Sequence, residues 1–225
     1  MDDDEIYKDD KQRPPRFDIT LCPESGMVRR CNGALGLLDG YTHVGWIADD
    51  NRFLTPGWDE RVLDALRTVP IVFCNDGVSP GSKPSHVFMD ARIPRALGWF
   101  LLPGIHSTFF DDAWQTLGTG ADATTGPLAK DGNGIGLDPL NQGLGIAYLA
   151  NVVVNHLYIE KDNRKSFAED QEVYRKWLRH GAEDDIARAR SALRPGRDAR
   201  GAASRPRAGA QRGADAVRLP ADPAH

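Results

Sequence analysis

The sequence predicts an α/β domain with an open sheet flanked by helices, and two observations indicate this class. Short apolar runs begin at His43, Pro70 and Ile146, and their length and composition are typical of strands that are covered on both faces of a sheet. Between these runs lie stretches with apolar residues at steps of three and four, as in helices that pack one face on a sheet. The chain has 225 residues, of which 40% are hydrophobic, which suffices for one such domain with a sizeable core and some additional chain.

Each predicted element follows from its local pattern. In chain order they are a strand over 17–21, a helix over 25–38, a strand over 43–48, a helix over 57–68, strands over 70–74 and 87–89, helices over 93–97 and 111–117, a strand over 146–154, and a helix that opens with the capping box Ser166-x-x-Glu169 and runs to about residue 193. Gly33 and Gly36 weaken the first helix, because glycine costs a helix interior about 1 kcal/mol. Thr55 and Pro56 have the residue types of a helix cap and a first helical position. The strand over 43–48 is expected to be buried and central.

The predicted domain organisation has one folded unit and two peripheral segments. Residues 1–16 are polar and predict a loop, and residues 17–180 form the domain. Within it, residues 118–145 are rich in Gly, Asp and Thr without periodicity, which predicts a functional loop or disorder. A helical extension over 181–193 follows. The tail over residues 194–225 lacks aromatic residues, and this composition predicts disorder. Its interpretations are a solvated tail, a spurious translation, or an arginine-rich segment that contacts an acidic partner.

Charge and cysteine content exclude several function classes. The formal net charge is −4, so global charge gives no reason to expect a nucleic-acid partner. The three cysteines form no CxxC pair, which indicates reduced thiols in a cytoplasmic protein and no zinc site of that type. No apolar run has the length of a transmembrane helix, and the acidic first residues do not resemble a signal peptide.

Two acidic pairs are the candidate chemical groups. Asp49 and Asp50 follow the strand over 43–48, at the edge of an open sheet where ligands bind. Two carboxylates there can hold a divalent cation, which can in turn hold a diphosphate. Asp111 and Asp112 open the helix over 111–117, where carboxylates are also favourable for structural reasons alone. Polar turn residues remain the alternative for the first pair.

The segment from Val28 to Leu66 resembles the central part of GT-A-type glycosyltransferases of the family-2 kind. These enzymes commonly show an Arg-Asn on a helix, a strand, an acidic DxD-type motif and a Pro-Gly-Trp helix entry. Arg30 and Asn32 approximate the first feature, Asp49-Asp50 fall at the acidic motif, and residues 56–58 read PGW. Downstream, the second acidic pair looks like the pair that presents the catalytic base, and a histidine after an apolar strand looks like the C-terminal metal ligand. The resemblance covers about residues 17–178.

The resemblance implies a GT-A fold, with a mixed Rossmann-like sheet flanked by helices, and a division of roles. The partners are a nucleotide-sugar donor and a glycan, lipid or small-molecule acceptor, and the cofactor is Mn²⁺ or Mg²⁺. The roles it implies are metal binding by Asp50 and His156, donor binding by Arg30, Asn32, Asp49 and Asp50, general-base catalysis by Asp112 with Asp111 as the second choice, and acceptor contacts by His106 and Trp114. From the residues alone, a core role for Trp114 and a strand-end or loop role for the two histidines stay open.

Two departures from the family pattern bear on activity. Ala48 stands where the family often has the first acidic residue, while Asp50 keeps the position of the usual direct ligand. The βαβ unit that holds the nucleobase in the family is incomplete, so the sheet is expected to have an exposed edge, and a start placed too late would account for this. The alternatives are therefore a non-catalytic nucleotide-sugar or glycan-binding remnant and a metal-dependent phosphohydrolase.

Overall fold

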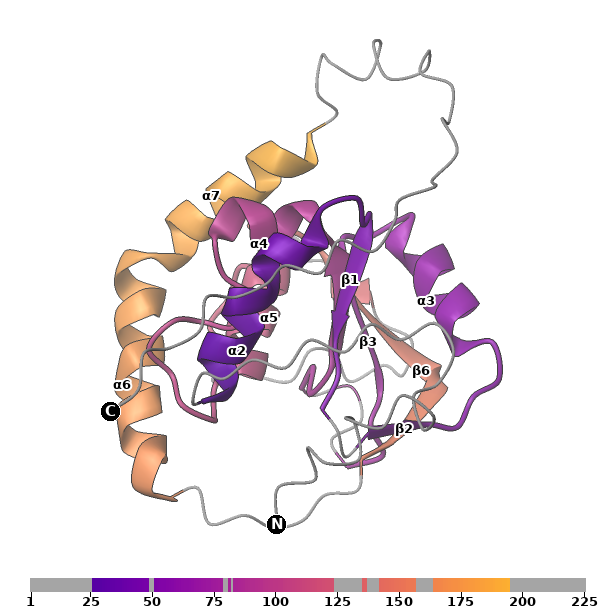
Figure 1. Ribbon diagram of the computed structural model, residues 1–225, viewed down its shortest axis with the longest axis horizontal. Helices are drawn as coiled ribbons and strands as arrows, with labels where there is room; N and C mark the ends of the chain where they lie inside the picture. The colour runs from indigo at the N-terminus through magenta and orange to yellow at the C-terminus, as the bar shows by residue number, and fades with distance from the viewer. Residues whose placement is uncertain are drawn as a thin grey trace, which may run out of the picture. The chain divides into compact units, whose positions relative to one another are not determined.

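The computed structural model is a mixed α/β fold (Figure 1). It describes residues 26–48, 51–78, 81, 83–123, 135–136, 142–156 and 164–194. The predicted loop over 1–16, the predicted strand over 17–21 and nearly all of the predicted tail lie outside these residues. The chain divides into two units, one that ends at Leu193 and one that begins at Arg194. None of the described helices is long and apolar enough to cross a membrane.

The sheet has six strands and mixed pairing. The strands are β1 (His43–Trp46), β2 (Asn51–Phe53), β3 (Ile71–Asn75), β4 (Val87–Asp90), β5 (Ile135–Gly136) and β6 (Ile146–His156). Their order is β1-β4-β3-β6-β2, with β5 beside β6. Among the described strands, β3 and β6 pair in parallel, and the other pairs are antiparallel. The predicted strands over 70–74, 87–89 and 146–154 are confirmed as β3, β4 and β6.

The helices cover both faces of this sheet. They are α2 (Met27–Gly33), the 3-10 helix η1 (Ala34–Leu38), α3 (Trp58–Leu66), α4 (Arg92–Leu97), α5 (Phe110–Thr119), α6 (Arg164–His180) and α7 (Ala182–Leu193). Successive side chains of a strand face opposite sides, so Ile71 and Phe73 belong to one core, and Val72 and Cys74 belong to another. The first core includes residues of α4, α5, α6 and α7, and the second includes residues of α3 (Figure 1).

A close approach of α5 to the sheet depends on one glycine. Gly118 lies in α5 directly against the first residue of β6, and a Cβ added at Gly118 would lie 2.5 Å from the Cβ of Ile146. This distance is shorter than any ordinary contact, so only glycine allows the helix to sit this close. The packing fixes the position of the whole helix, including its first turn, relative to β6.

The strand over 43–48 was expected to be buried and central, and this expectation is wrong. β1 is shorter, ends at Trp46, and pairs only with β4 among the described residues. Val44 and Trp46 are half-buried and Gly45 is exposed. The apolar run is real, but no described strand continues the sheet beyond β1.

Several helix boundaries also differ from the prediction. The cap of α3 is Gly57 in the left-handed conformation and not Thr55, which instead contacts β6. The helix over 25–38 becomes a 3-10 helix after Gly33. α6 begins at Arg164, so Ser166 lies inside its first turn, where its hydroxyl oxygen lies 3.0 Å from that of Ser107. The chain then breaks at residue 181 into a separate helix, α7.

Candidate functional site

The first acidic pair lies outside the described residues, but the residues on both sides of it are described. Asn51 donates its backbone N–H to the carbonyl oxygen of Ala48 at 3.2 Å, so the two flanking residues are in contact. Asn51 then begins β2, and its Cα pairs with that of His156 at the end of β6. The residue that follows the predicted DxD-type position therefore pairs with the predicted metal-binding histidine. The side chain of His156 is not among the described parts.

β6 reaches this position because it is long and irregular. Its first part pairs with β3, and the register then jumps from Leu149 opposite Cys74 to Val153 opposite Asn75. Thr55 supports the irregular part, since its hydroxyl oxygen accepts the N–H of Val153 at 2.8 Å. Beyond the jump, the end of β6 leaves β3 and pairs with β2. Only residues 47–50 separate β2 from β1, a span of at most roughly 18 Å.

The side-chain amide of Asn51 has no hydrogen-bond partner within the described part of the chain. Its oxygen and its nitrogen are both buried, and neither has a hydrogen-bond partner among the described residues. Leaving a buried polar group unpaired costs about 1–3 kcal/mol, and native proteins keep few such groups. A carboxamide oxygen is a ligand that hard divalent cations accept, and its NH₂ group donates to phosphate oxygens. The amide therefore fits a metal–diphosphate group beside the acidic pair. The described residues contain no cluster of three or more His, Cys, Asp or Glu that could hold a metal.

The second acidic pair forms a charged cluster with a lysine. Asp111 and Asp112 occupy the first turn of α5, and Lys83 Nζ lies 3.4 Å from Oδ2 of Asp112 and 3.9 Å from Oδ2 of Asp111. The Asp112 side chain is 4% exposed, whereas that of Asp111 is 18% exposed. Burial and the charge of Asp112 raise the pKa of Asp111 to about 6, against the opposing effect of Lys83. Burial acts to lower the pKa of Lys83, but the charges of the two carboxylates outweigh it and raise that pKa.

This geometry reverses the order of preference for the general base. A base must reach the proton that it abstracts, and its pKa is best placed near the working pH. Asp112 is almost closed to solvent and is paired with Lys83. Asp111 is mostly buried but keeps 18% of its side chain exposed, and its pKa of about 6 leaves it ionised but only weakly acidic at neutral pH. The structure therefore favours Asp111 for this role.

The segment that carries Lys83 is held by a buried polar network. Asp76 accepts the Ser85 hydroxyl at 2.8 Å and the N–H of Val78 at 3.0 Å. His86 is fully buried, and its Nε2 accepts the N–H of Cys74 at 3.2 Å. Burial raises the pKa of the Cys74 thiol to about 12, so this cysteine is no candidate nucleophile. The network therefore holds the segment that carries Lys83 in place beside α5.

A third polar group lies just before α5. Asp170 in α6 is fully buried, and its carboxylate accepts the backbone N–H groups of His106, Ser107 and Thr108 at 2.7, 3.0 and 2.9 Å. It also accepts the Thr108 hydroxyl at 2.9 Å and lies 2.9 Å from His106 Nδ1. Burial alone would raise the pKa of Asp170, but the hydrogen bonds from Ser107, Thr108 and His106 lower it overall. The next residue, Phe109, is in the left-handed region at φ 66°, which is uncommon for a bulky residue and is typical of a tightly constrained turn.

Two further predicted site residues, Asn32 and Arg30, lie in α2. Asn32 donates to the Leu101 carbonyl at 2.8 Å and accepts the N–H groups of Phe100 and Leu101 at 2.7 and 2.9 Å. Its amide thus fastens α2 to the chain at 100–101, and its predicted contact with the donor stays a prediction. Arg30 lies on the exposed side of α2.

Trp114 was expected to contact the acceptor, and this expectation is corrected. Its side chain is 1% exposed and packs against Trp99 and Phe100 at ring-centroid distances of 5.6 and 5.7 Å. A sugar-stacking platform needs an exposed ring face, which Trp114 does not have. It is a core residue, because its position in α5 faces the first core.

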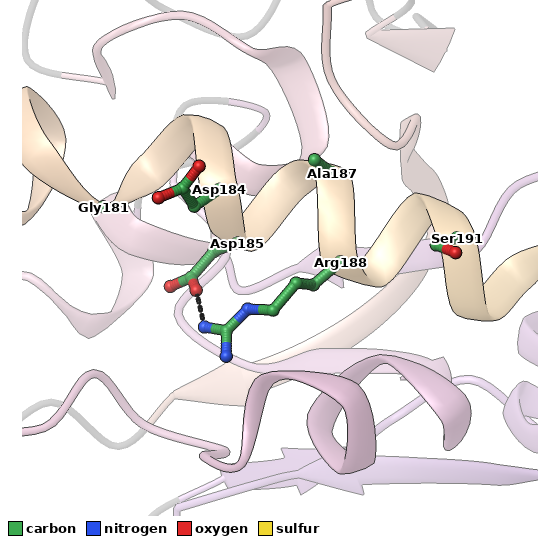
Figure 2. Close-up of a pocket in the computed structure, with 6 residues that line it drawn as sticks. All are labelled: Gly181, Asp184, Asp185, Ala187, Arg188 and Ser191. Atoms are coloured by element: carbon green, nitrogen blue, oxygen red, sulfur yellow. Dashed lines mark hydrogen bonds and ion pairs between the residues drawn. The ribbon is translucent and has the colours of Figure 1, made fainter.

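A shallow surface hollow lies away from all of these groups (Figure 2). Six residues in and just before α7 line it: Gly181, Asp184, Asp185, Ala187, Arg188 and Ser191. Arg188 and Asp185 form an ion pair within it. No predicted site residue lines this hollow. Its lining residues all come from α7 or the residue before it, so side chains from different elements do not converge there.

Comparison with protein-family models, with curated proteins and with solved structures finds no significant match. The family resemblance therefore depends on the motifs and on the arrangement of the residues around them.

Sequence reasoning missed three residues of the site region. Lys83 lies in a stretch that reads only as a loop, and Asp170 reads as one more polar residue of an amphipathic helix. Asn51 was not singled out, although it directly follows the acidic pair. Only the position of Asn51 carried a sequence signal, because the partners of the other two residues come from distant parts of the chain.

Proposed function

We propose that the chain is a metal-dependent glycosyltransferase of the GT-A type, which moves a sugar from a nucleotide-diphosphate donor to an acceptor hydroxyl. The observation that carries this proposal is the pairing of Asn51 with His156. It brings the residue after the predicted acidic motif against the predicted metal-binding histidine, which comes from the far end of the chain. The unpaired amide of Asn51 supports a polar ligand at the same place.

In this proposal the donor is held at the junction of β2 and β6. Asp50 and His156 would hold Mn²⁺ or Mg²⁺, which when bound supplies a Lewis acid for the leaving diphosphate. Asn51 adds a carboxamide beside these ligands, and Asp49 contacts the ribose or orients the ligands. Asp111 accepts the proton of the acceptor hydroxyl, and its pKa of about 6 suits that task at neutral pH.

The first test is isothermal titration of the full chain with UDP and with GDP, with and without Mn²⁺. We expect binding that requires Mn²⁺ and is lost on addition of EDTA. Asp50→Ala and His156→Ala should each weaken binding at least tenfold, while Asp59→Ala, at an exposed position of α3, should leave it unchanged. Equal binding by all three variants contradicts the proposed metal site.

Turnover is tested separately with a panel of nucleotide sugars. Asp111→Asn should keep donor binding and lower the transfer rate by about 10²–10⁴, the usual contribution of a general base. Release of phosphate or nucleoside monophosphate without dependence on an acceptor would instead identify a phosphohydrolase.

A second candidate is a donor-binding protein without turnover. Ala48 favours it, because this residue stands where the resemblance places the first acidic residue of the motif. Metal-dependent binding of a nucleotide with no transfer from any donor would establish this second candidate.

A further inference from the structure

His106 and Asp170 form a pair with unequal exposure. The His106 side chain is 61% exposed, while that of Asp170 is fully buried. Nδ1 of the imidazole lies 2.9 Å from Oδ1 of the carboxylate, and that same oxygen accepts the backbone N–H of His106 at 2.7 Å. One end of the ring is thus fixed inside the protein, and the rest of the ring is open to solvent.

This contact decides the protonation of the ring. An ionised carboxylate only accepts hydrogen bonds, so Nδ1 of His106 must carry the proton. The pKa of Asp170 is held below its usual range, which keeps the carboxylate ionised. In the neutral imidazole, Nε2 then carries a lone pair and can only accept a hydrogen bond. The group that it can bind is a hydroxyl or another donor, and not a phosphate or a carboxylate.

The segment around His106 is unusually well held for a loop. Three successive backbone N–H groups donate to Asp170, and Ser107 Oγ lies 3.0 Å from Ser166 Oγ in α6. The segment runs directly into Phe109 and the first turn of α5, which carries Asp111. The imidazole and the candidate base are therefore positioned by one constrained stretch of chain. Such prior ordering lowers the entropic cost of binding a ligand.

We infer that His106 binds a hydroxyl group of the acceptor through Nε2, and that Asp170 is a positioning residue which sets its tautomer. The inference rests on the proposed function, which supplies a substrate with hydroxyl groups. A metal is the other ligand that a carboxylate-held imidazole commonly takes. The hydroxyl follows from the tautomer that the contact with Asp170 sets, in which Nε2 accepts a hydrogen bond.

Nitrogen NMR of the full chain labelled with ¹⁵N-histidine tests the tautomer directly. The chain has six histidines, and the missing signals of His106→Asn assign the ring of interest. At pH 8 we expect a protonated Nδ1 and a bare Nε2. The opposite tautomer, or an even mixture of the two, overturns the inference whatever the activity of the protein.

Kinetics with the donor found above tests the binding role. His106→Asn keeps an N–H near the place of Nδ1, so it preserves the contact with Asp170 but removes Nε2. We expect the KM for the acceptor to rise about tenfold, with kcat and the KM for the donor within about twofold of wild type. Asp111→Asn is the contrasting variant, since it should lower kcat.

The kinetic results distinguish a failure of the acceptor role of His106 from a failure of the glycosyltransferase proposal. An unchanged acceptor KM in His106→Asn overturns the inference while leaving the glycosyltransferase proposal in place. A fall in kcat with an unchanged acceptor KM also overturns it. If the wild-type chain transfers no sugar, the glycosyltransferase proposal fails and the acceptor role of His106 fails with it, while the NMR result still decides the tautomer that Asp170 imposes.

Discussion

Replacement of Asp170 by alanine should be among the most damaging single changes in this protein. The carboxylate accepts five hydrogen bonds, three from successive backbone N–H groups and two from the side chains of Thr108 and His106. The two side-chain donors can turn toward water, but the three backbone groups cannot leave the turn. At about 1–3 kcal/mol for each of these three unpaired groups, we expect Asp170→Ala to lower the free energy of unfolding by about 3–9 kcal/mol.

The assay is guanidinium unfolding followed by tryptophan fluorescence at pH 7. Asp170→Asn keeps one acceptor oxygen and the side-chain shape, so a smaller loss of about 2–3 kcal/mol is expected, and it serves if the alanine variant does not fold. Glu169→Ala, at the exposed neighbouring position of α6, is the matched control and should change stability by less than about 0.5 kcal/mol. A loss below about 1 kcal/mol in Asp170→Ala would refute the reasoning.

The same carboxylate gives this prediction a pH dependence of known sign. Hydrogen bonds hold the pKa of Asp170 below its usual range in the folded protein. Its stabilisation is therefore fully present above the unfolded-state pKa of about 3.9 and is lost as the pH falls through the lower folded-state value. The difference between wild type and Asp170→Asn should shrink below about pH 4.

Three further predictions concern the acidic cluster and the packing of α5. Because the pKa of Asp111 is raised to about 6, its ionisation costs stability as the pH rises from about 4 to 6, so Asp111→Asn should be about 2 kcal/mol more stable than wild type at pH 8 and equal to it at pH 4 in guanidinium unfolding. Lys83→Met removes the charge that lowers this pKa, so the acidic limb of the pH dependence of turnover should move to higher pH; an unmoved limb would count against Asp111 as the base. Gly118→Ala places a Cβ 2.5 Å from that of Ile146 and should cost about 3 kcal/mol in thermal unfolding, whereas Gly36→Ala, with no atom within 4 Å, should be neutral, and equal effects of the two changes would contradict the packing described.

The strongly patterned elements were predictable from the sequence. β3, β4 and β6 are short apolar runs bounded by polar residues, and α4 ends at Gly98 in the left-handed conformation, as a glycine after an apolar helical stretch indicates. The second acidic pair was also placed correctly in the first turn of a helix. In each case the signal is local, because side-chain periodicity and terminal residues carry it.

The sequence predictions that the structure corrected concern properties that neighbouring elements determine. The apolar run at 43–48 gave no sign that β1 would lie at an edge, because burial depends on neighbouring strands and not on the strand itself. β2 has three residues, too few for any periodicity, and exists because the irregular end of β6 pairs with it. Trp114 was a candidate acceptor contact beside two carboxylates, with a core role as the alternative, and its turn of α5 faces the core.

For the candidate site, too, some properties follow from the sequence and others only from the tertiary structure. The sequence by itself determined which carboxylates, histidines and amides are present, and their order supported a glycosyltransferase hypothesis. Only the tertiary structure decided which of them meet. It set Lys83 against Asp112, left Asp111 more exposed than Asp112, and joined Asp170 to His106. These contacts bring together residues that are distant in sequence, and the surrounding burial and charge, which no local pattern encodes, set their protonation and reach.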